Sequence, residues 1–159
     1  MASDGADGLA SRLNEAAARL IAAVESVDGE PWRRVPEPRV WSIGREAEHV
    51  AEAGGYHQWI VRLTIGDKVS TRRPVLERLA LTPEHSSAEV VAMIRDRTDE
   101  GARLIRSLSD EQLDLPTRPP RANGQRLAET IERVLIGHYD AHRMEIERKY
   151  AGKETTSAR

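Results

Sequence analysis

The chain has 159 residues, with 24 Lys and Arg against 26 Asp and Glu, and thus a formal net charge of −2 at pH 7. This balance removes the electrostatic argument for nucleic-acid binding, which needs clustered positive charge. The chain has no Cys, which excludes a disulfide scaffold, a cysteine zinc site and a cysteine nucleophile. The length suits one domain. We expect that domain to cover residues 1–159, with a core at about 7–151 and flexible ends.

The hydrophobic content indicates a protein that stays in water. No apolar run reaches the roughly 20 residues that span a bilayer, and the N-terminal sequence MASDGADG lacks both the basic and the apolar part of a signal peptide. We therefore expect a cytoplasmic protein with no membrane partner. The chain has no Phe, so its core must come from Leu, Ile, Val and Ala, which suit packed helices.

Two amphipathic helices are predicted in the first part of the chain. Over residues 7–27 the apolar side chains recur every three or four positions, as they do along one face of a helix. Residues 28–40 contain three prolines and predict a connection without regular structure. Ser42 can cap a second helix that runs to about residue 65, where a Gly-Asp pair ends it.

The middle of the chain predicts a long connection and a third helix. Residues 67–85 carry two prolines and no clear period. Ser86 and Glu89 then have the spacing of a capping box, in which a hydroxyl and a carboxylate three residues later satisfy the first backbone N–H groups. This box opens a helix that runs to about residue 108.

A fourth helix is predicted at the end of the chain. Residues 109–113 can form one further turn, residues 114–124 are rich in proline and predict a loop, and residues 125–150 carry a new apolar stripe. No segment has the period of a strand. Four helices of roughly 20 residues must bury their stripes on one another, which predicts an all-α four-helix bundle, and the long connections allow a crossover.

The five histidines are the most informative residues. His138 and His142 are spaced i, i+4, so their rings share a helix face, and they continue the apolar stripe of the fourth helix into the bundle. His49 lies on the inward stripe of the second helix. His57 follows eight residues later, near the same face but offset by roughly 80°. It can either support the ligands from outside or lie at the surface, and we expect the surface. His85 lies beside a helix start, where we expect no role for it.

Two interpretations of the three inward histidines remain open on spacing alone. Three neutral imidazoles that converge in a bundle core can bind a divalent metal and leave further positions for water or substrate. The same residues also fit a core in which each buried histidine is satisfied by a hydrogen bond.

Three other side chains are candidates for the site. Glu46 lies three residues before His49, and Glu145 lies three residues after His142. Either carboxylate can act as an acid or base or orient an imidazole through its second nitrogen, and the alternative for each is a solvated helix face. Tyr56 lies seven residues after His49 and faces inward, either lining a cofactor pocket or filling the core.

Three segments resemble the DinB-like superfamily, which includes the YfiT-like proteins. Residues 41–50 (WSIGREAEHV) resemble the start of its second helix, and residues 108–113 (LSDEQL) resemble the end of its third. Residues 137–146 (GHYDAHRMEI) resemble its last-helix pattern H-x-x-x-H-x-x-x-I. The order of the segments extends the likeness over roughly residues 9–150. Gly44 departs from the family, which usually has a larger residue at this point of the first turn.

The resemblance implies a fold and a metal site. The fold is a four-helix bundle with up-down-down-up order and a long crossover. The metal is a divalent ion held by one histidine of the second helix and two of the last, which are His49, His138 and His142 here. By ligand chemistry alone, three imidazoles suit zinc or nickel, and also iron. Relatives include mycothiol-dependent maleylpyruvate isomerase and bacillithiol and other thiol S-transferases, and YfiT-like members are labelled metal-dependent hydrolases.

The leading functional hypothesis is therefore a metal-dependent enzyme that transfers or uses a low-molecular-weight thiol in detoxification, as an S-transferase or isomerase. Because the chain has no Cys, the thiol must come from a cosubstrate. One alternative is a hydrolase that uses a metal-bound water. Another is a non-catalytic, stress-related bundle. The expected partners are a small electrophile or thiol, with no nucleic acid, and a homodimer stays open.

Overall fold

The computed structural model describes residues 4–27, 29–70, 80–118 and 124–154. The expected flexible ends therefore lie partly outside the described residues. The elements are, in chain order, α1 (Asp4–Glu25), a single 3-10 turn η1 (Glu30–Trp32), α2 (Ile43–Ile65), α3 (Ser87–Arg106), α4 (Asp110–Leu113), α5 (Leu127–Thr130), a π-helical segment η2 (Ile131–Ile136) and α6 (Gly137–Glu154). The segments α5, η2 and α6 follow one another directly and build the predicted fourth helix.

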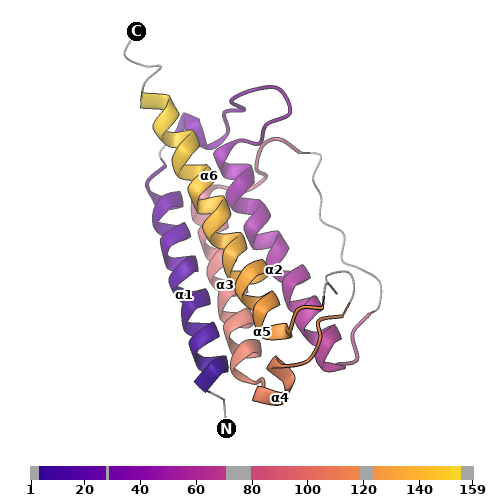
Figure 1. The fold of residues 1–159 in the computed structure, drawn as a ribbon. Helices are drawn as coiled ribbons and strands as arrows, with labels where there is room; N and C mark the ends of the chain where they lie inside the picture. Colours follow the sequence, from indigo (N-terminus) through magenta and orange to yellow (C-terminus); the bar gives the residue numbers. More distant parts are fainter. Residues whose placement is uncertain (1–3, 28, 71–79, 119–123, 155–159) are drawn as a thin grey trace.

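The helices form a bundle with the expected order (Figure 1). From the end that holds the N-terminus, α1 runs up, α2 and α3 both run down, and the last helix runs up again. Because α2 and α3 are parallel, the chain must cross the length of the bundle between them, and residues 71–79 of that crossover lie outside the described part. Both α1 and α2 pack against α3 and α6, so the core lies between all four helices.

The predicted helix caps are present. Ser42 accepts a hydrogen bond from the backbone N–H of Arg45, which satisfies one of the open donors at the start of α2. Ser86 and Glu89 form the capping box of α3 in both directions. Ser109 opens a second box at α4, the single turn that the sequence predicts at residues 109–113.

The first helix and its exit differ from expectation. α1 begins at Asp4, not near residue 7, because Ala6 is buried in the core and the carboxylates of Asp4 and Asp7 face the positive N-terminal end of the helix dipole. Within the connection predicted to be irregular, Pro31 lies in the turn η1, directly after its first residue Glu30. Proline suits the first turn of a helix because its fixed φ is already helical and its missing N–H would have no helical partner there.

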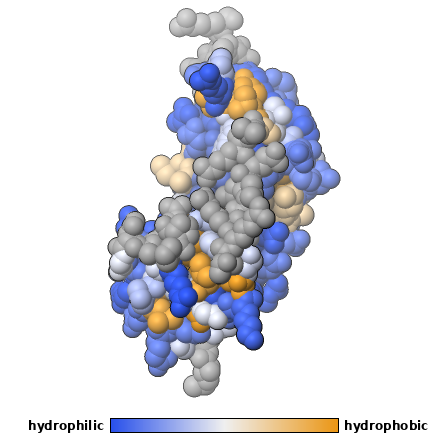
Figure 2. Space-filling view, turned by 90° about the vertical axis from the view of Figure 1, so that its right-hand side faces the viewer, coloured by the Kyte–Doolittle hydropathy of each residue, from blue (hydrophilic) through white to orange (hydrophobic). Residues whose placement is uncertain are grey.

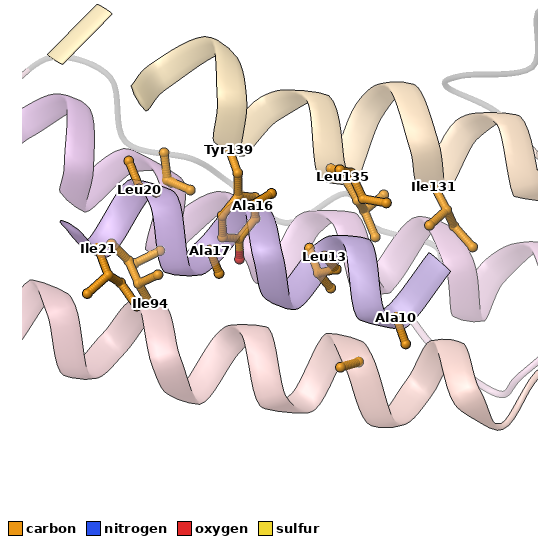
Figure 3. Close-up of a cluster of buried hydrophobic side chains, with 14 of the residues drawn as sticks. Ala10, Leu13, Ala16, Ala17, Leu20, Ile21, Ile94, Ile131, Leu135 and Tyr139 are labelled. Carbon is orange, nitrogen blue, oxygen red and sulfur yellow. The ribbon is translucent and has the colours of Figure 1, made fainter. Parts of the chain in front are cut away.

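The core is built from small and branched side chains, as the composition predicts (Figure 3). Alanines and leucines alternate along α1 and face Ile94 of α3 and Ile131, Leu135 and Tyr139 of the last helix. A Cβ added at Gly101 of α3 would lie 3.3 Å from Cδ2 of Leu13. The missing side chain therefore lets α1 and α3 approach closely.

The loop before the last helix is drawn together by backbone hydrogen bonds. The N–H of Leu127 donates to the carbonyl of Leu115 over 2.8 Å, and the N–H of Thr117 donates to the carbonyl of Gln125 over 2.9 Å. These bonds engage residues 125–127, which explains why the helix begins at Leu127 and not at the predicted residue 125. Residues 119–123 of this loop lie outside the described residues.

On the face that Figure 2 shows, hydrophilic residues predominate, and hydrophobic residues gather in limited areas. Among the described residues, Leu115 and Met144 are the large hydrophobic side chains that stay exposed. None of the described helices is both long and apolar enough to cross a membrane.

Candidate metal centre

Three histidines from two helices converge between α2 and α6. His49 comes from α2, and His138 and His142 come from successive turns of α6. One ring nitrogen of each lies within 4.8 Å of those of the other two. The ring centroids are 5.3 Å apart for His49 and His138, 5.2 Å for His49 and His142, and 4.4 Å for His138 and His142. This arrangement can hold a metal ion, with three imidazole nitrogens as ligands.

The π-helical segment sets the direction in which the two histidines of α6 face. Residues 131–136 follow the wider π turn and end directly before Gly137 and His138. One extra residue in a turn rotates all later residues by about 100° relative to an unbroken α-helix. Such segments are frequent at functional sites. The sequence predicts one continuous α-helical stripe here and gives no sign of the π segment.

Gly44 brings two distant segments against the start of α2. A Cβ at this position would lie 2.6 Å from Cγ of Pro83 and 2.7 Å from both the carbonyl oxygen and Cε2 of Trp32. Real Cβ atoms do not come so close, so only glycine fits. The departure from the family pattern at this residue therefore has a packing reason, which depends on neighbours far away in the sequence.

Glu46 orients His142. Its Oε2 lies 2.6 Å from Nδ1 of His142, and its Oε1 accepts a hydrogen bond from Nζ of Lys149, also over 2.6 Å. Burial alone would raise the pKa of the Glu46 carboxyl, but the hydrogen bonds from His142 and Lys149 outweigh it and hold the pKa below its usual value. An ionised carboxylate only accepts hydrogen bonds. Nδ1 of His142 therefore carries the hydrogen, and Nε2 keeps its lone pair for a metal.

Glu145 turns away from the histidines. Its carboxylate accepts two hydrogen bonds from the guanidinium of Arg148 over 2.6 and 3.0 Å and lies 3.7 Å from Nζ of Lys149. Of the two carboxylates that the sequence proposes, Glu46 contacts a histidine of the cluster and Glu145 makes ion pairs on the outer side of α6.

His49 is packed against a tryptophan whose ring also contacts an arginine. The ring centroids of Trp41 and His49 are 4.9 Å apart, and the guanidinium carbon of Arg45 lies 5.5 Å from the centroid of the Trp41 ring. This contact is within the range of a cation–π interaction. Trp41 therefore limits the rotation of the His49 ring.

Arg45 also belongs to a buried ion network, and His85 joins it. Arg45 and Glu48 are both 2% exposed and bond each other over 2.9 Å, while Arg45 holds Glu52 with two hydrogen bonds. Oε1 of Glu48 lies 2.7 Å from Nδ1 of His85, and this hydrogen bond raises the pKa of His85. His85 therefore has a structural contact: its ring and the backbone N–H groups of Glu84 and His85 all bond Glu48 and hold the segment before α3 to α2.

His57 is buried, so the prediction of a surface position is wrong. His57 is 4% exposed. Its ring stands almost perpendicular to that of His138, at an angle of 84°, with 4.9 Å between the ring centroids. The offset of 80° fails as a guide because α2 packs on α3 as well as on α6. His57 is a neighbour of the three-histidine group and not a member of it.

Tyr56 lies in the core, where its ring centroid is 5.9 Å from that of His57, and it is not one of the three converging residues. It stacks on Trp59 with 5.8 Å between the ring centroids and forms a small apolar cluster with Trp59 and Ile60. Of the two alternatives for Tyr56, the structure favours core filling. Lys149, in contrast, contacts Glu46 and was not a candidate on sequence grounds, because a lone lysine near a helix end carries no signal of burial.

A cavity among the described residues lies elsewhere. It measures about 670 Å³ and opens between the C-terminal halves of α2 and α3, where it is lined mainly by polar and charged side chains, among them Arg62, Glu100 and Arg103. None of the three histidines lines it. The cavity therefore adds nothing to the metal centre.

Comparison with known proteins agrees with the fold and the histidine cluster. Searches of curated proteins and of solved structures find no match to the chain. The family model described as the DinB superfamily matches residues 12–146, which include all four long helices in whole or large part and each of the three histidines. The chain belongs to the DinB superfamily.

Proposed function

We propose that this protein is a divalent-metal-dependent enzyme that uses His49, His138 and His142 as metal ligands and a low-molecular-weight thiol as cosubstrate. The observation that carries the proposal is the convergence of three imidazoles, with ligand atoms within 4.8 Å of one another. The proposed reaction is of the S-transferase or isomerase type. In a transfer, the thiol sulfur would form a bond to an electrophilic carbon and the leaving group would depart from that carbon.

The residues present suit a metal ion. Imidazole nitrogen is a good ligand for zinc, nickel and iron, and a site with three protein ligands leaves a position for a substrate. Glu46 fixes the ring and the tautomer of His142 from the side away from the cluster, as outer carboxylates do in many metal sites. Trp41 restrains His49.

The charge of the ligand set favours an anionic ligand, such as a thiolate or a hydroxide. Three neutral imidazoles leave the double positive charge of the ion uncompensated, so an anionic fourth ligand is attracted. When bound, such an ion would lower the pKa of a thiol or a water beside it. The chain has no Cys, so the thiol would have to be a separate molecule.

The positions of the carboxylates favour a thiol over a hydrolytic reaction. Activation of water commonly uses a general base within hydrogen-bond reach. Glu46 is held by His142 and Lys149, and Glu145 is held by Arg148. A thiol bound to a metal loses its proton without such a base.

Thiol dependence tests the proposal. The purified protein, loaded with zinc or nickel, is incubated with a chromogenic electrophile with and without a low-molecular-weight thiol, beside the variant His138→Ala. We expect turnover that needs the thiol, the metal and His138. Turnover of an ester without a thiol would favour the hydrolase, and a protein that takes up no metal would favour the non-catalytic bundle.

A further inference from the structure

Lys149 is separated from the histidine cluster by Glu46, which bonds His142 with one oxygen and Lys149 with the other. The side chain of Lys149 is almost fully buried. Its side chain is 5% exposed. Nζ donates to Oε1 of Glu46 over 2.6 Å and to the backbone carbonyl of Trp41 over 2.8 Å, and it lies 3.7 Å from Glu145. An ammonium group has three donors, so these contacts can engage all of them.

The two short contacts of Lys149 lead to two different histidines. Glu46 bonds Nδ1 of His142 with its other oxygen, over 2.6 Å. Trp41 packs its ring against His49, with 4.9 Å between the centroids. One ammonium group therefore connects the residue that orients His142 with the residue that restrains His49, although these histidines belong to different helices.

We propose that Lys149 is a positioning residue of the metal centre, which holds Glu46 and Trp41 in the places from which they fix His142 and His49. The inference rests on the proposed function, since it concerns the same three ligands. It adds a residue whose ammonium group bonds Glu46 and the Trp41 carbonyl, and which is not one of the three proposed ligands. Lys149 acts through its neighbours, and its loss should change the order of the site and not the number of ligands.

Electrostatics explain why the hydrogen bond between Glu46 and His142 depends on Lys149. A buried ammonium group is stable only where hydrogen bonds and opposite charge replace its water, and Glu46 and the Trp41 carbonyl provide both. Without Lys149, Oε1 of Glu46 has lost this donor, and the carboxylate can rotate away from His142. The backbone at Trp41 also loses its link to α6.

The neighbouring Arg148 provides a matched control. It lies on the same turn of α6 and carries the same charge, but its side chain is 69% exposed and bonds Glu145. Arg148→Met removes one positive charge from this region without touching Glu46 or Trp41. Lys149→Met removes the contacts, and Lys149→Arg keeps the charge as a test of rescue. Lys149→Gln replaces Lys149→Met if the latter does not fold.

The experiment measures metal affinity by competition with a chelator, with cobalt(II) and zinc(II) as probes, and the absorption spectrum of bound cobalt. Mutation of a residue that hydrogen-bonds a metal ligand typically lowers metal affinity 10- to 100-fold. Lys149 bonds such a residue and not the ligand itself, so we expect about 10-fold weaker binding in Lys149→Met. The stoichiometry should stay at one ion. Arg148→Met should bind as the parent does, and Lys149→Arg should recover part of the loss.

A second measurement tests the role of Lys149 without a bound metal. Nitrogen-15 spectra of the metal-free protein report whether Nδ1 of His142 carries the hydrogen that Glu46 accepts. We expect this tautomer in the parent and in Arg148→Met, and a mixture of tautomers in Lys149→Met. Parent-like affinity and parent-like histidine spectra in Lys149→Met would overturn the role of Lys149. A parent that binds no metal would overturn the proposed function, and the spectra would still decide whether Lys149 orients His142.

Discussion

Two glycines of α2 should respond to the same substitution in opposite directions. A Cβ at Gly44 would lie 2.6 to 2.7 Å from Pro83 and Trp32, whereas ordinary contacts between carbon atoms are about 3.5–4.0 Å. One of the neighbours is the carbonyl oxygen of Trp32, and a backbone atom cannot turn aside as a side chain can. At Gly55 a Cβ would meet nothing within 4 Å.

The expected magnitudes follow from these contacts. Overpacking of a buried site costs about 1–3 kcal/mol, while Gly→Ala inside a helix gains up to about 1 kcal/mol in propensity. We therefore expect Gly44→Ala to lower the free energy of unfolding by about 2 kcal/mol and Gly55→Ala to raise it by about 0.5–1 kcal/mol. For a chain of this length, 1 kcal/mol shifts Tm by about 2–4 °C.

Urea unfolding and thermal unfolding, both followed by circular dichroism, measure the two changes. Gly55→Ala serves as the control for helix propensity, since it lies in the same helix. If Gly44→Ala were as stable as the parent or more so, the close approach of Trp32 and Pro83 to α2 would be wrong, and with it the packing explanation for glycine at this position.

Three further predictions concern the site and its surroundings. Glu46→Gln should weaken zinc binding about 10- to 100-fold in chelator competition, because the amide no longer fixes His142 as an ionised acceptor does; unchanged affinity would show that Glu46 does not orient the ligand. His57→Gln should keep one metal ion per chain while His49→Gln loses it, because His49 belongs to the converging group and His57 does not. Elemental analysis measures both, and equal loss in the two variants would make His57 a ligand. The hydrogen bond to Glu48 raises the pKa of His85 above its value in the unfolded chain, so its stabilising effect is complete below about pH 6.5 and is lost as the pH rises through the folded-state pKa. The difference in Tm between the parent and His85→Ala should therefore shrink from mildly acidic to alkaline pH, and a difference that grows with pH would contradict this sign.

Local sequence signals predict much of the fold. The periodic apolar residues give the four long helices, and the hydroxyls of Ser42 and Ser86 mark two of their starts, because caps depend on residues three positions apart. The i, i+4 spacing puts His138 and His142 on one face of α6, and His49 lies on the inward stripe of α2, which agrees with the observed cluster. The direction in which the pair on α6 faces is set by the π segment.

Features that depend on distant neighbours were not predictable. The burial of His57 follows from the packing of α2 on two other helices, which a single amphipathic face does not indicate. The role of Gly44 depends on Trp32 and Pro83. Lys149 is buried because Glu46 and Trp41 lie opposite it, and a long charged side chain near a helix end is usually solvated. The π segment has no sequence pattern that separates it from an α-helix.

The metal content of the protein tests the central claim most directly. The untagged chain and His138→Ala are purified in parallel and analysed for zinc, nickel and iron, both as isolated and after incubation with the divalent ions. We expect about one equivalent of metal in the parent and its loss in the variant, with helical content unchanged. A parent that holds no metal and takes up none would contradict the metal centre and leave three core histidines in a non-catalytic bundle.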